Sequence, residues 1–435
     1  MAPEETGKFN QERELSPPKI ARGVHERPTQ KRHRRSVIPT RARDVEVSER
    51  RELAPLTEAA QIDHRLLDSD AMALIEVLQR AGHEAYFVGG CVRDLLLGLK
   101  PKDFDLATSA KPNEIKRLFR NCRLIGRRFK LAHLLYGRGK IIEVATFRRA
   151  PKEEFQDGVL IVDDNNFGDR LSDAYRRDFT INALFYDPIQ RCIFDECGGL
   201  KDLHERRLKL IGEPRQRFQE DPIRMLRGLK FLARLKLNFD PTTEAALRSE
   251  GGELIKAAKP RFLQELLRML QGGAAKHSYQ LLEEFGFLQI LCPELLACWH
   301  HAPARRGESE AIFERLDLLS GNQRERLSSE ILIAALFWPL FDALSSAYDF
   351  PYPVRARLVQ RLLAPFAERV SFPGKDLLRA STLLAALRDL EEEHPLELSP
   401  PELEDAMTLA TLCGVEVKLS LERRPLARKR RKRRR

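Results

Sequence analysis

Strand-forming patterns occur only in the first half of this 435-residue chain. This uneven distribution limits the possible folds more than any other feature of the sequence. Between about residues 84 and 205, short runs rich in Val, Ile, Phe and Tyr alternate with amphipathic helical patterns. After "KLIGEP" (residues 209–214) the strand patterns fade, and helical spacing continues to about residue 415. The sequence therefore predicts a mixed α/β head followed by an all-α neck and body.

Five segments follow from this change of pattern. The head is predicted at 63–205, a helical neck at 206–270 and a helical body at 271–420. Residues 1–62 lack periodicity and are predicted to be a disordered basic N-terminal arm. Residues 421–435, "LERRPLARKRRKRRR", are predicted to be a disordered Arg-rich tail, because like charges in one block cannot pack together.

The basic character of the chain lies at its two ends. The formal net charge is +11, of which the last fifteen residues carry +9 and residues 1–50 carry +4. The remaining residues are therefore nearly neutral. An Arg-rich tail suits a polyanion such as RNA, because binding releases counterions from the phosphates. A tail that serves solubility or localisation is the alternative.

Several classes of protein are excluded by composition. No apolar run approaches the ~18–20 residues that a membrane span needs. The first twenty residues include several acids and lack the apolar stretch of a secretory signal. We therefore expect a cytoplasmic protein without membrane contact. The seven cysteines form no CxxC pair, and "RCIFDEC" (residues 191–197) lacks a second pair at zinc spacing. Reduced, mostly buried thiols are expected.

The stretch "DFDLAT" places two aspartates, Asp103 and Asp105, in a segment that suits a strand. At positions i and i+2 both side chains would point to one face, with Cα atoms about 6–7 Å apart. Two carboxylates in this arrangement can share divalent cations, and oxygen ligands suit Mg²⁺, whose shell is completed by water and substrate phosphates. A solvent-facing polar strand or a turn is the alternative interpretation.

The motif "VGGCVRD" precedes these aspartates by about fifteen residues. Gly89 and Gly90 follow a strand and would allow a phosphate to approach the backbone, while Arg93 could add a charged contact. A plain strand-to-helix turn would satisfy the two glycines equally well.

In "IIEVATF", Glu143 interrupts an otherwise apolar strand. An acid in such a place is costly unless it is paired or metal-bound, so Glu143 is a candidate third carboxylate. Arg148, at the end of that strand, is a candidate phosphate contact.

Taken together, the ordered motifs resemble the class II nucleotidyltransferases of the polymerase-β-like superfamily. These are the bacterial poly(A) polymerases and the CCA-adding tRNA nucleotidyltransferases. The segments that carry the resemblance are "YFVGGCVRDLLLG", "PKDFDLATSA", "IIEVATFR", "RRDFTINALFYD" and "EDPIRMLRGLKFLARL".

The resemblance implies an α/β polymerase-β-like head in which Asp103 and Asp105 hold two catalytic Mg²⁺ ions. It also implies that Asp178, in "RRDFTINA", belongs to the active site. Whether Glu143 or Asp178 is the third carboxylate stays open at this point. The residues expected to bind the incoming nucleotide are Gly89, Gly90, Arg93, Arg148, Asp221, Arg224 and Arg227.

The neck segment "EDPIRMLRGLKFLARL" has an apolar stripe beside a basic one. The resemblance implies that Asp221 and Arg224 read the edge of the nucleotide base. Asp221 is also expected to be an N-cap before Pro222 at the first helical position. The alternative for the basic stripe is a solvated helix face.

Residues 118–137 distinguish the two subfamilies, since this segment is similar to one characteristic of bacterial poly(A) polymerases. Its Arg127, Arg128 and Lys130 are predicted to hold a single-stranded RNA 3′ end by its phosphates, although an ordinary connection with a basic face is possible.

The resulting prediction is a template-independent enzyme that adds AMP from ATP to RNA 3′ ends and so promotes RNA decay. CCA addition to tRNA and a catalytically silent RNA-binding protein are the alternatives. Proteins of RNA decay are possible partners.

Overall fold

The structure is a computed structural model, and it describes residues 62–417 except 127–129, 150–151, 157–158, 164–165, 320, 346–351, 393 and 395–397. The predicted tail and, but for Ile62, the predicted N-terminal arm lie outside the described residues. Arg127 and Arg128 also lie outside them.

The head contains a mixed sheet in the order β3-β4-β5-β2-β1-β8-β9. The central pair β2–β5 is parallel, and the other neighbours are antiparallel. The strands are β1 (Ala85–Val88), β2 (Leu106–Thr108), β3 (Cys122–Ile125), β4 (Leu131–Leu135), β5 (Ile141–Thr146), β8 (Leu184–Asp187) and β9 (Cys192–Asp195). β6 (Lys152–Gln156) and β7 (Val159–Asp163) form a separate antiparallel hairpin.

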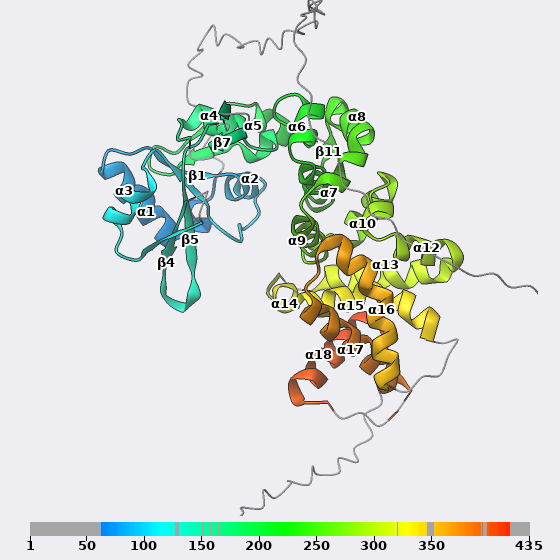
Figure 1. Cartoon of the computed structure of the whole chain (residues 1–435). Helices are drawn as coiled ribbons and strands as arrows, with labels where there is room; N and C mark the ends of the chain where they lie inside the picture. The colour runs from blue at the N-terminus through cyan, green and yellow to red at the C-terminus, as the bar shows by residue number, and fades with distance from the viewer. Residues whose placement is uncertain are drawn as a thin grey trace, which may run out of the picture. The chain divides into compact units, whose positions relative to one another are not determined.

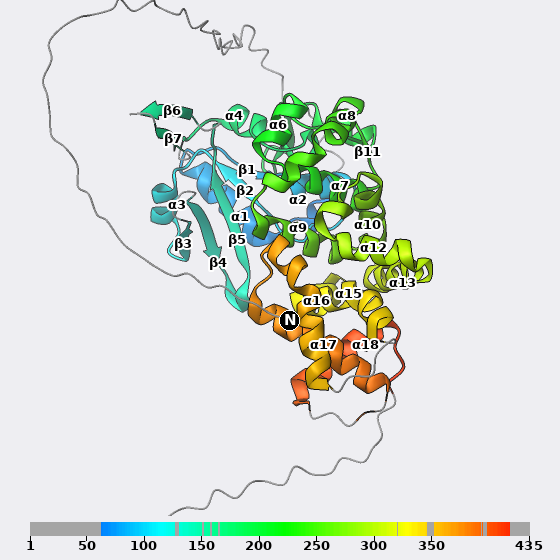
Figure 2. The same ribbon diagram turned by 45° about the vertical axis from the view of Figure 1, so that its right-hand side comes forward.

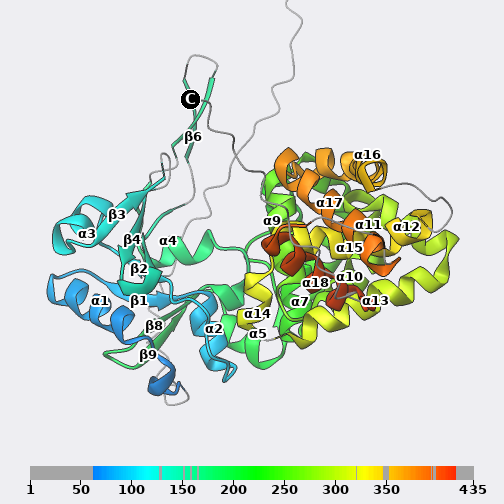
Figure 3. The same cartoon turned by 90° about the horizontal axis from the view of Figure 1, so that it is seen from below.

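Alternation along the strands divides the sheet into two faces. Phe87 and Leu106 point into one core, which α1 and α3 cover, and these helices lie beside the strands in Figure 3. Tyr86 and Ala107 point to the opposite face, where α4 contributes Ala174. The head helices are η2 (His64–Leu66), α1 (Ser69–Arg80), α2 (Gly90–Leu96), α3 (Pro112–Leu118), η3 (Gly137–Gly139), α4 (Arg170–Tyr175), η4 (Thr180–Asn182) and α5 (Gly199–His204).

The predicted strand "DFDLAT" is shorter in the structure. β2 begins at Leu106, so Asp103 and Asp105 precede the strand instead of lying within it. The β8–β9 hairpin was not predicted, and neither was the two-stranded pair of β10 (Arg207–Leu208) with β11 (Asn238–Phe239). These strands are only two to four residues long, too short for a clear alternating pattern.

Beyond the head the described chain is mainly helical, as predicted, and Figure 1 colours these helices from green to red. The neck helices are α6 (Pro214–Glu220), α7 (Ile223–Leu235), α8 (Pro241–Glu250), η5 (Gly251–Lys256) and α9 (Lys259–Leu270). The body helices are α10 (Ala275–Glu284), α11 (Leu288–Leu291), α12 (Pro293–His301), α13 (Pro303–Leu318), α14 (Gly321–Arg326), α15 (Ser329–Ser345), α16 (Tyr352–Val370), α17 (Gly374–Glu391) and α18 (Pro400–Cys413).

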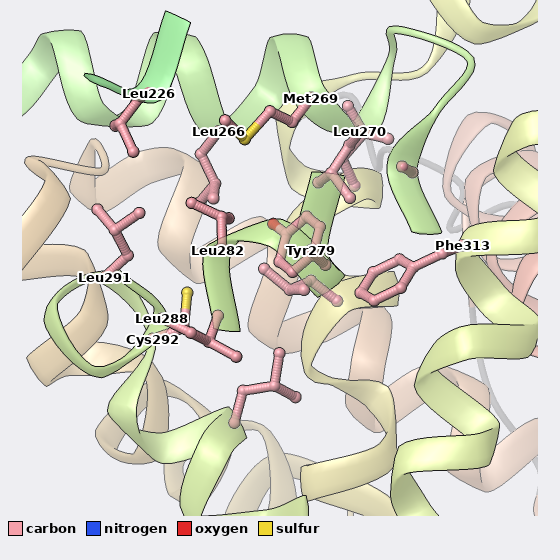
Figure 4. Packing of buried hydrophobic residues seen from close by; sticks show 14 of the residues in the cluster. Leu226, Leu266, Met269, Leu270, Tyr279, Leu282, Leu288, Leu291, Cys292 and Phe313 are labelled. Atoms are coloured by element: carbon pink, nitrogen blue, oxygen red, sulfur yellow. The ribbon is translucent and has the colours of Figure 1, made fainter. Parts of the chain in front are cut away.

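One hydrophobic cluster runs from the last part of the head through the neck into the body. It includes Phe179 of the head, Leu210 just after the predicted boundary and Leu226 of α7. Figure 4 shows its middle, where Tyr279 stacks on Phe313 with ring centroids 4.4 Å apart. The predicted boundary at 205/206 therefore falls inside a shared core.

Two predictions from composition can be compared with the described helices and thiols. None of the described helices combines the length and hydropathy that crossing a bilayer requires. All seven cysteines are free thiols; five are buried, whereas Cys197 and Cys413 are partly exposed. This matches the expectation of reduced, mostly buried thiols.

Candidate active site

Asp105 and Glu143 are neighbours on one face of the sheet. β2 and β5 are parallel with Leu106 opposite Val144, so the residues that precede these two also lie side by side. Since Leu106 and Val144 point into the core beneath α1 and α3, the preceding side chains point to the opposite face. Asp103 is close enough for its charge to act on Asp105. Three predicted carboxylates are therefore gathered at the start of β2.

The crowding of charge alters the acidity of Asp105. Its pKa is raised to about 6 by partial loss of hydration and by the negative charges of Glu143 and Asp103, against the opposing charge of Arg177. The side chain nevertheless keeps access to solvent. A cation at this place would remove the repulsion that disfavours ionisation of Asp105.

The donor set suits Mg²⁺, which prefers carboxylate oxygens and usually keeps several waters. The oxygens of Asp103, Asp105 and Glu143 do not all lie within 4.8 Å of one another. Mg²⁺ does not need three protein carboxylates, because one or two suffice when substrate phosphates complete the shell. Asp103 and Asp105 fit this role, whereas Oε1 of Glu143 lies 3.3 Å from Nε2 of His133.

Among the described residues, the one group of three ligand-type side chains within 4.8 Å is Asp389, Glu392 and His394, in the body. A cation already occupies this cluster. Nη1 of Arg355 lies 2.6 Å from Oδ1 of Asp389, and its Nη2 lies 2.9 Å from Oε2 of Glu392. We interpret the group as an ion-pair cluster between α16 and α17.

The Gly89–Gly90 turn joins β1 to α2 next to the carboxylates. Gly89 has φ 75° and ψ −126°, a conformation that side-chain-bearing residues rarely adopt. A Cβ on Gly89 would lie 3.3 Å from Nη1 of Arg177. The backbone N–H of the preceding Val88 donates to the carbonyl of Asp105 at 3.0 Å, which ties this turn to the carboxylate segment.

Arg93 is buried and its guanidinium contacts protein groups. Its Nη1 donates to Oδ1 of Asn182 at 2.6 Å, and its Nη2 donates to Oδ1 of Asp94 at 2.6 Å. Its guanidinium also lies over the ring of Phe231, at 5.0 Å from the centroid. Nucleotide binding by Arg93 stays a prediction, and the structure gives this residue a clear role in joining α2 to η4 and α7.

Asn182 continues this polar chain to Asp178 and Arg227. Its Nδ2 donates to Oδ1 of Asp178 at 3.0 Å, and Nε of Arg227 donates to Oδ2 of Asp178 at 2.8 Å. Burial alone would raise the pKa of Asp178, but the Arg227 charge and these hydrogen bonds hold it below its ordinary value. Asp178 is therefore an ionised partner of the neck, whereas Glu143 is the acid beside Asp105.

The pair expected to read a base lies further along the neck. Asp221 accepts two hydrogen bonds from Arg261, whereas Arg224 donates from Nη1 to the carbonyl of Arg217 at 2.6 Å. Burial and the Arg217 charge lower the pKa of Arg224. The N-cap of α7 is Pro222, and no side chain caps this helix. The expectation that Asp221 is the N-cap of α7 is therefore wrong.

Two predicted residues lie away from the carboxylates. Arg148 follows β5 by two residues, and because β5 is parallel to β2 it lies about 16 Å along the sheet from Asp105. Its Nη2 donates to the carbonyl of Lys130 at 3.4 Å. Lys130 lines a cavity of about 420 Å³ together with Lys111, Arg117 and Phe167. The structure therefore groups Arg148 with Lys130 and not with Asp105.

Three residues of the site were not predicted. Arg177 acts electrostatically on Asp105 and lies against Gly89. Asn182 bridges Arg93 and Asp178. Both are in the motif "RRDFTINA", where an Arg before the aspartate and an Asn four residues after it were available signals. Arg261 gave no signal, because it is forty residues from Asp221 and meets it only through helix packing.

Parts of the chain match two known families of domains. Residues 85–209 match the poly A polymerase head domain, and residues 236–298 match a probable RNA- and SrmB-binding site of polymerase A. Poly(A) polymerase I of Haemophilus influenzae is 42% identical over 300 residues, which are 65% of this chain and 64% of the relative. A CCA-adding enzyme of Lactobacillus helveticus is 39% identical over 212 residues, 48% of this chain and 52% of that enzyme. The chain thus spans less than two thirds of the curated relatives it matches.

Solved structures confirm the predicted fold class. The CCA-adding enzyme of Bacillus stearothermophilus, solved in complex with CTP, superimposes with a TM-score of 0.55 at 27% identity, covering 79% of this chain and 77% of that one. A CCA-adding enzyme in an apo form gives a TM-score of 0.56 at 23% identity, with 83% of each chain covered. The chain is thus similar in sequence to bacterial poly(A) polymerase I and to CCA-adding enzymes, and it shares their fold.

Proposed function

We propose that the protein is a template-independent poly(A) polymerase that transfers AMP from ATP to RNA 3′ ends. The observation that carries the proposal is the carboxylate group of Asp103, Asp105 and Glu143 beside the Gly89 turn. The curated poly(A) polymerase relative also matches a longer part of this chain than the CCA-adding relative does, 65% against 48%. A role in RNA decay, with partner proteins of that process, belongs to the same proposal.

In the proposed reaction, Asp103 and Asp105 would hold Mg²⁺, and the bound ion would supply Lewis-acid activation of the RNA 3′-hydroxyl and charge neutralisation on the phosphates. Arg177 adds positive charge beside them, where negative charge grows during phosphoryl transfer. The Gly89 turn lets the triphosphate approach the backbone. Glu143 adds negative charge at the edge of the site, which favours retention of the cation. Positioning and electrostatics account for most of the catalysis.

Nucleotide choice is assigned to Asp221 and Arg224. A carboxylate accepts and a guanidinium donates, which complements the adenine edge with its N6 amino donor and N1 acceptor. Both described contacts of Arg224 use Nη1, so its other N–H groups can face a base. The polar chain from Arg93 to Arg227 holds α7 against the head, which fixes this pair relative to the Gly89 turn.

The RNA strand is assigned to the basic surface formed by α3, β3 and Lys130. Exposed cations gather here, and the one acidic residue within α3 and β3 is Glu114, whose side chain accepts from the backbone N–H of Lys111. Phosphates can be held on such a surface without base readout, and Phe167 offers a stacking ring. The cations are Lys111, Lys116, Arg117, Arg120, Arg123 and Lys130.

A nucleotide-by-nucleotide extension assay tests the function. Purified full-length protein is incubated with Mg²⁺ and a generic RNA primer, with one NTP at a time. We expect long homopolymer extension with ATP and little extension with the other three. An Asp103→Ala variant serves as the control and should extend nothing; normal incorporation by this variant would contradict the catalytic assignment.

CCA addition is the second candidate function, supported by the 39% identity to a CCA-adding enzyme. It predicts that the protein adds two C and one A to a tRNA lacking its 3′ end and then stops. That result would replace the poly(A) proposal. Absence of any nucleotide incorporation would favour a catalytically silent RNA-binding protein.

A further inference from the structure

Asp221 is held by an arginine from a different helix. Arg261 of α9 donates from Nη1 to Oδ1 of Asp221 at 2.7 Å and from Nη2 to Oδ2 at 2.9 Å. A two-pronged contact fixes both the position and the plane of a carboxylate, which a single hydrogen bond cannot do. The Asp221 side chain is 25% exposed and the Arg261 side chain 47%, so a ligand can still reach the carboxylate.

Nothing in the α6–α7 connection itself sets this orientation. Pro222 is the N-cap of α7, and no side chain caps that helix. The backbone N–H of Asp221 donates to the carbonyl of Arg217 at 3.2 Å, which places the main chain but leaves the carboxylate free to rotate. Arg261 therefore supplies the constraint on the carboxylate.

Arg261 can act as a fixed support because α9 is firmly packed. Phe262, Leu266 and Met269 are buried in the shared core. Glu265 lies 2.5 Å from Nζ of Lys230 on α7, which ties α9 to the helix that carries Arg224 and Arg227. Arg261 thus holds the Asp221 carboxylate at a fixed position relative to α9.

We propose that Arg261 is a positioning residue that sets the preference for ATP over CTP. The proposal rests on the nucleotide-selecting role assigned to Asp221. Adenine and cytosine both present an amino donor next to a ring acceptor, so the charges of Asp221 and Arg224 suit either base. A purine places this edge farther from the ribose than a pyrimidine does. A carboxylate held in one place fits one of these bases, whereas a mobile carboxylate can meet both. Each oxygen retains a lone pair for the base when Arg261 is bound.

The test compares variants of Arg261 with Arg268→Ala. Arg268 is on the same helix, is also 47% exposed and pairs with Glu265, so it controls for general loss of charge and of a surface ion pair. Full-length proteins are assayed for single-nucleotide addition to a short RNA primer with ATP and with CTP separately. The readouts are kcat/KM for each nucleotide and the melting temperature.

We expect Arg261→Ala to lower the ATP:CTP ratio of kcat/KM by about 10-fold or more, while Arg268→Ala stays within about twofold of the parent. Arg261→Lys, which keeps the charge but loses the fork, should give an intermediate ratio. An unchanged ratio in folded Arg261→Ala overturns the proposal. If Arg261→Ala does not fold, Arg261→Lys and Arg261→Gln decide the matter, and an unchanged ratio in both overturns it. Failure of the parent protein to extend the primer with ATP would instead overturn the proposed function.

Discussion

At the scale of single residues, Asp105 has the most informative chemistry in the molecule. Its pKa of about 6 means that the folded protein without metal disfavours the ionised carboxylate. Without metal, the contribution of Asp105 to the free energy of unfolding is therefore most favourable at acidic pH, and it is lost as the pH rises through about 6. Bound Mg²⁺ would reverse that penalty, because it favours ionisation.

This predicts a pH-dependent response to Mg²⁺. Adding Mg²⁺ with a non-hydrolysable ATP analogue should raise the melting temperature at pH 7.5, and the increase should shrink below pH 6 as protons compete for the carboxylates. Asp105→Asn should abolish the increase and lower nucleotide incorporation on the order of 100-fold or more. Without metal, the same variant should melt slightly higher than the parent at pH 7.5. An equal Mg²⁺ response in parent and variant would remove Asp105 from the metal site.

A second residue-scale prediction concerns Asp178 and Arg227, whose charges lie 2.6 Å apart. Arg227→Met leaves a largely buried carboxylate without its cation and should cost about 2 kcal/mol at pH 7. Because the pKa of Asp178 is lowered in the folded state, this stability is present above pH 4 and is lost as the carboxylate protonates. The loss in Arg227→Met should therefore be full at pH 7 and shrink as the pH falls below about 4 in urea unfolding. The double variant Arg227→Met/Asp178→Asn should recover part of the lost free energy of unfolding. If the losses of the two single variants simply add in the double variant, the two side chains are not coupled.

At the scale of elements, the β1–α2 turn depends on one glycine conformation. Gly89→Ala would strain a backbone with φ 75° and ψ −126° and bring its Cβ to 3.3 Å from Arg177, so we expect a loss of about 2–3 kcal/mol together with reduced activity.

Gly98→Ala is the matched control, since it also has positive φ but has nothing within 4 Å of an added Cβ. Gly98→Ala should lower the free energy of unfolding by about 1 kcal/mol and leave nucleotide incorporation unchanged. Gly90→Ala, whose nearest contact is 3.6 Å away, should be tolerated. Equal activity in the Gly89→Ala and Gly98→Ala proteins would refute a role for the turn in nucleotide binding.

At the scale of the whole molecule, the head segment that carries Asp178 shares its core with the neck. Phe179 and Phe231 meet edge to face with ring centroids 5.8 Å apart, so Asp178 and Arg227 are brought together by apolar packing next to them. Figure 2 shows α6 and α7 among the green helices that follow the head strands. The segment that carries Asp178 and the helix α7 that carries Arg224 are therefore parts of one continuous structure.

The tail provides a separate whole-molecule prediction, made from sequence because residues 421–435 lie outside the described residues. Deleting them removes nine net positive charges. RNA affinity should fall, and the slope of log affinity against log salt concentration should become shallower. A Gly/Ser replacement of equal length controls for chain length. An unchanged slope would indicate that the tail does not contact RNA.

The sequence by itself determined the order of elements and the chemical types at the site. Two carboxylates close together in sequence near a strand, glycines after another strand and an Arg-rich helix are local signals, and they do not depend on packing. Tertiary structure alone decided which of these groups meet. The parallel register of β2 and β5 brings Glu143 to Asp105 and carries Arg148 away. Packing of α7 and α9 brings Arg227 to Asp178 and Arg261 to Asp221. Residues forty or more positions apart become neighbours only when the apolar faces of such helices are buried against the rest of the chain.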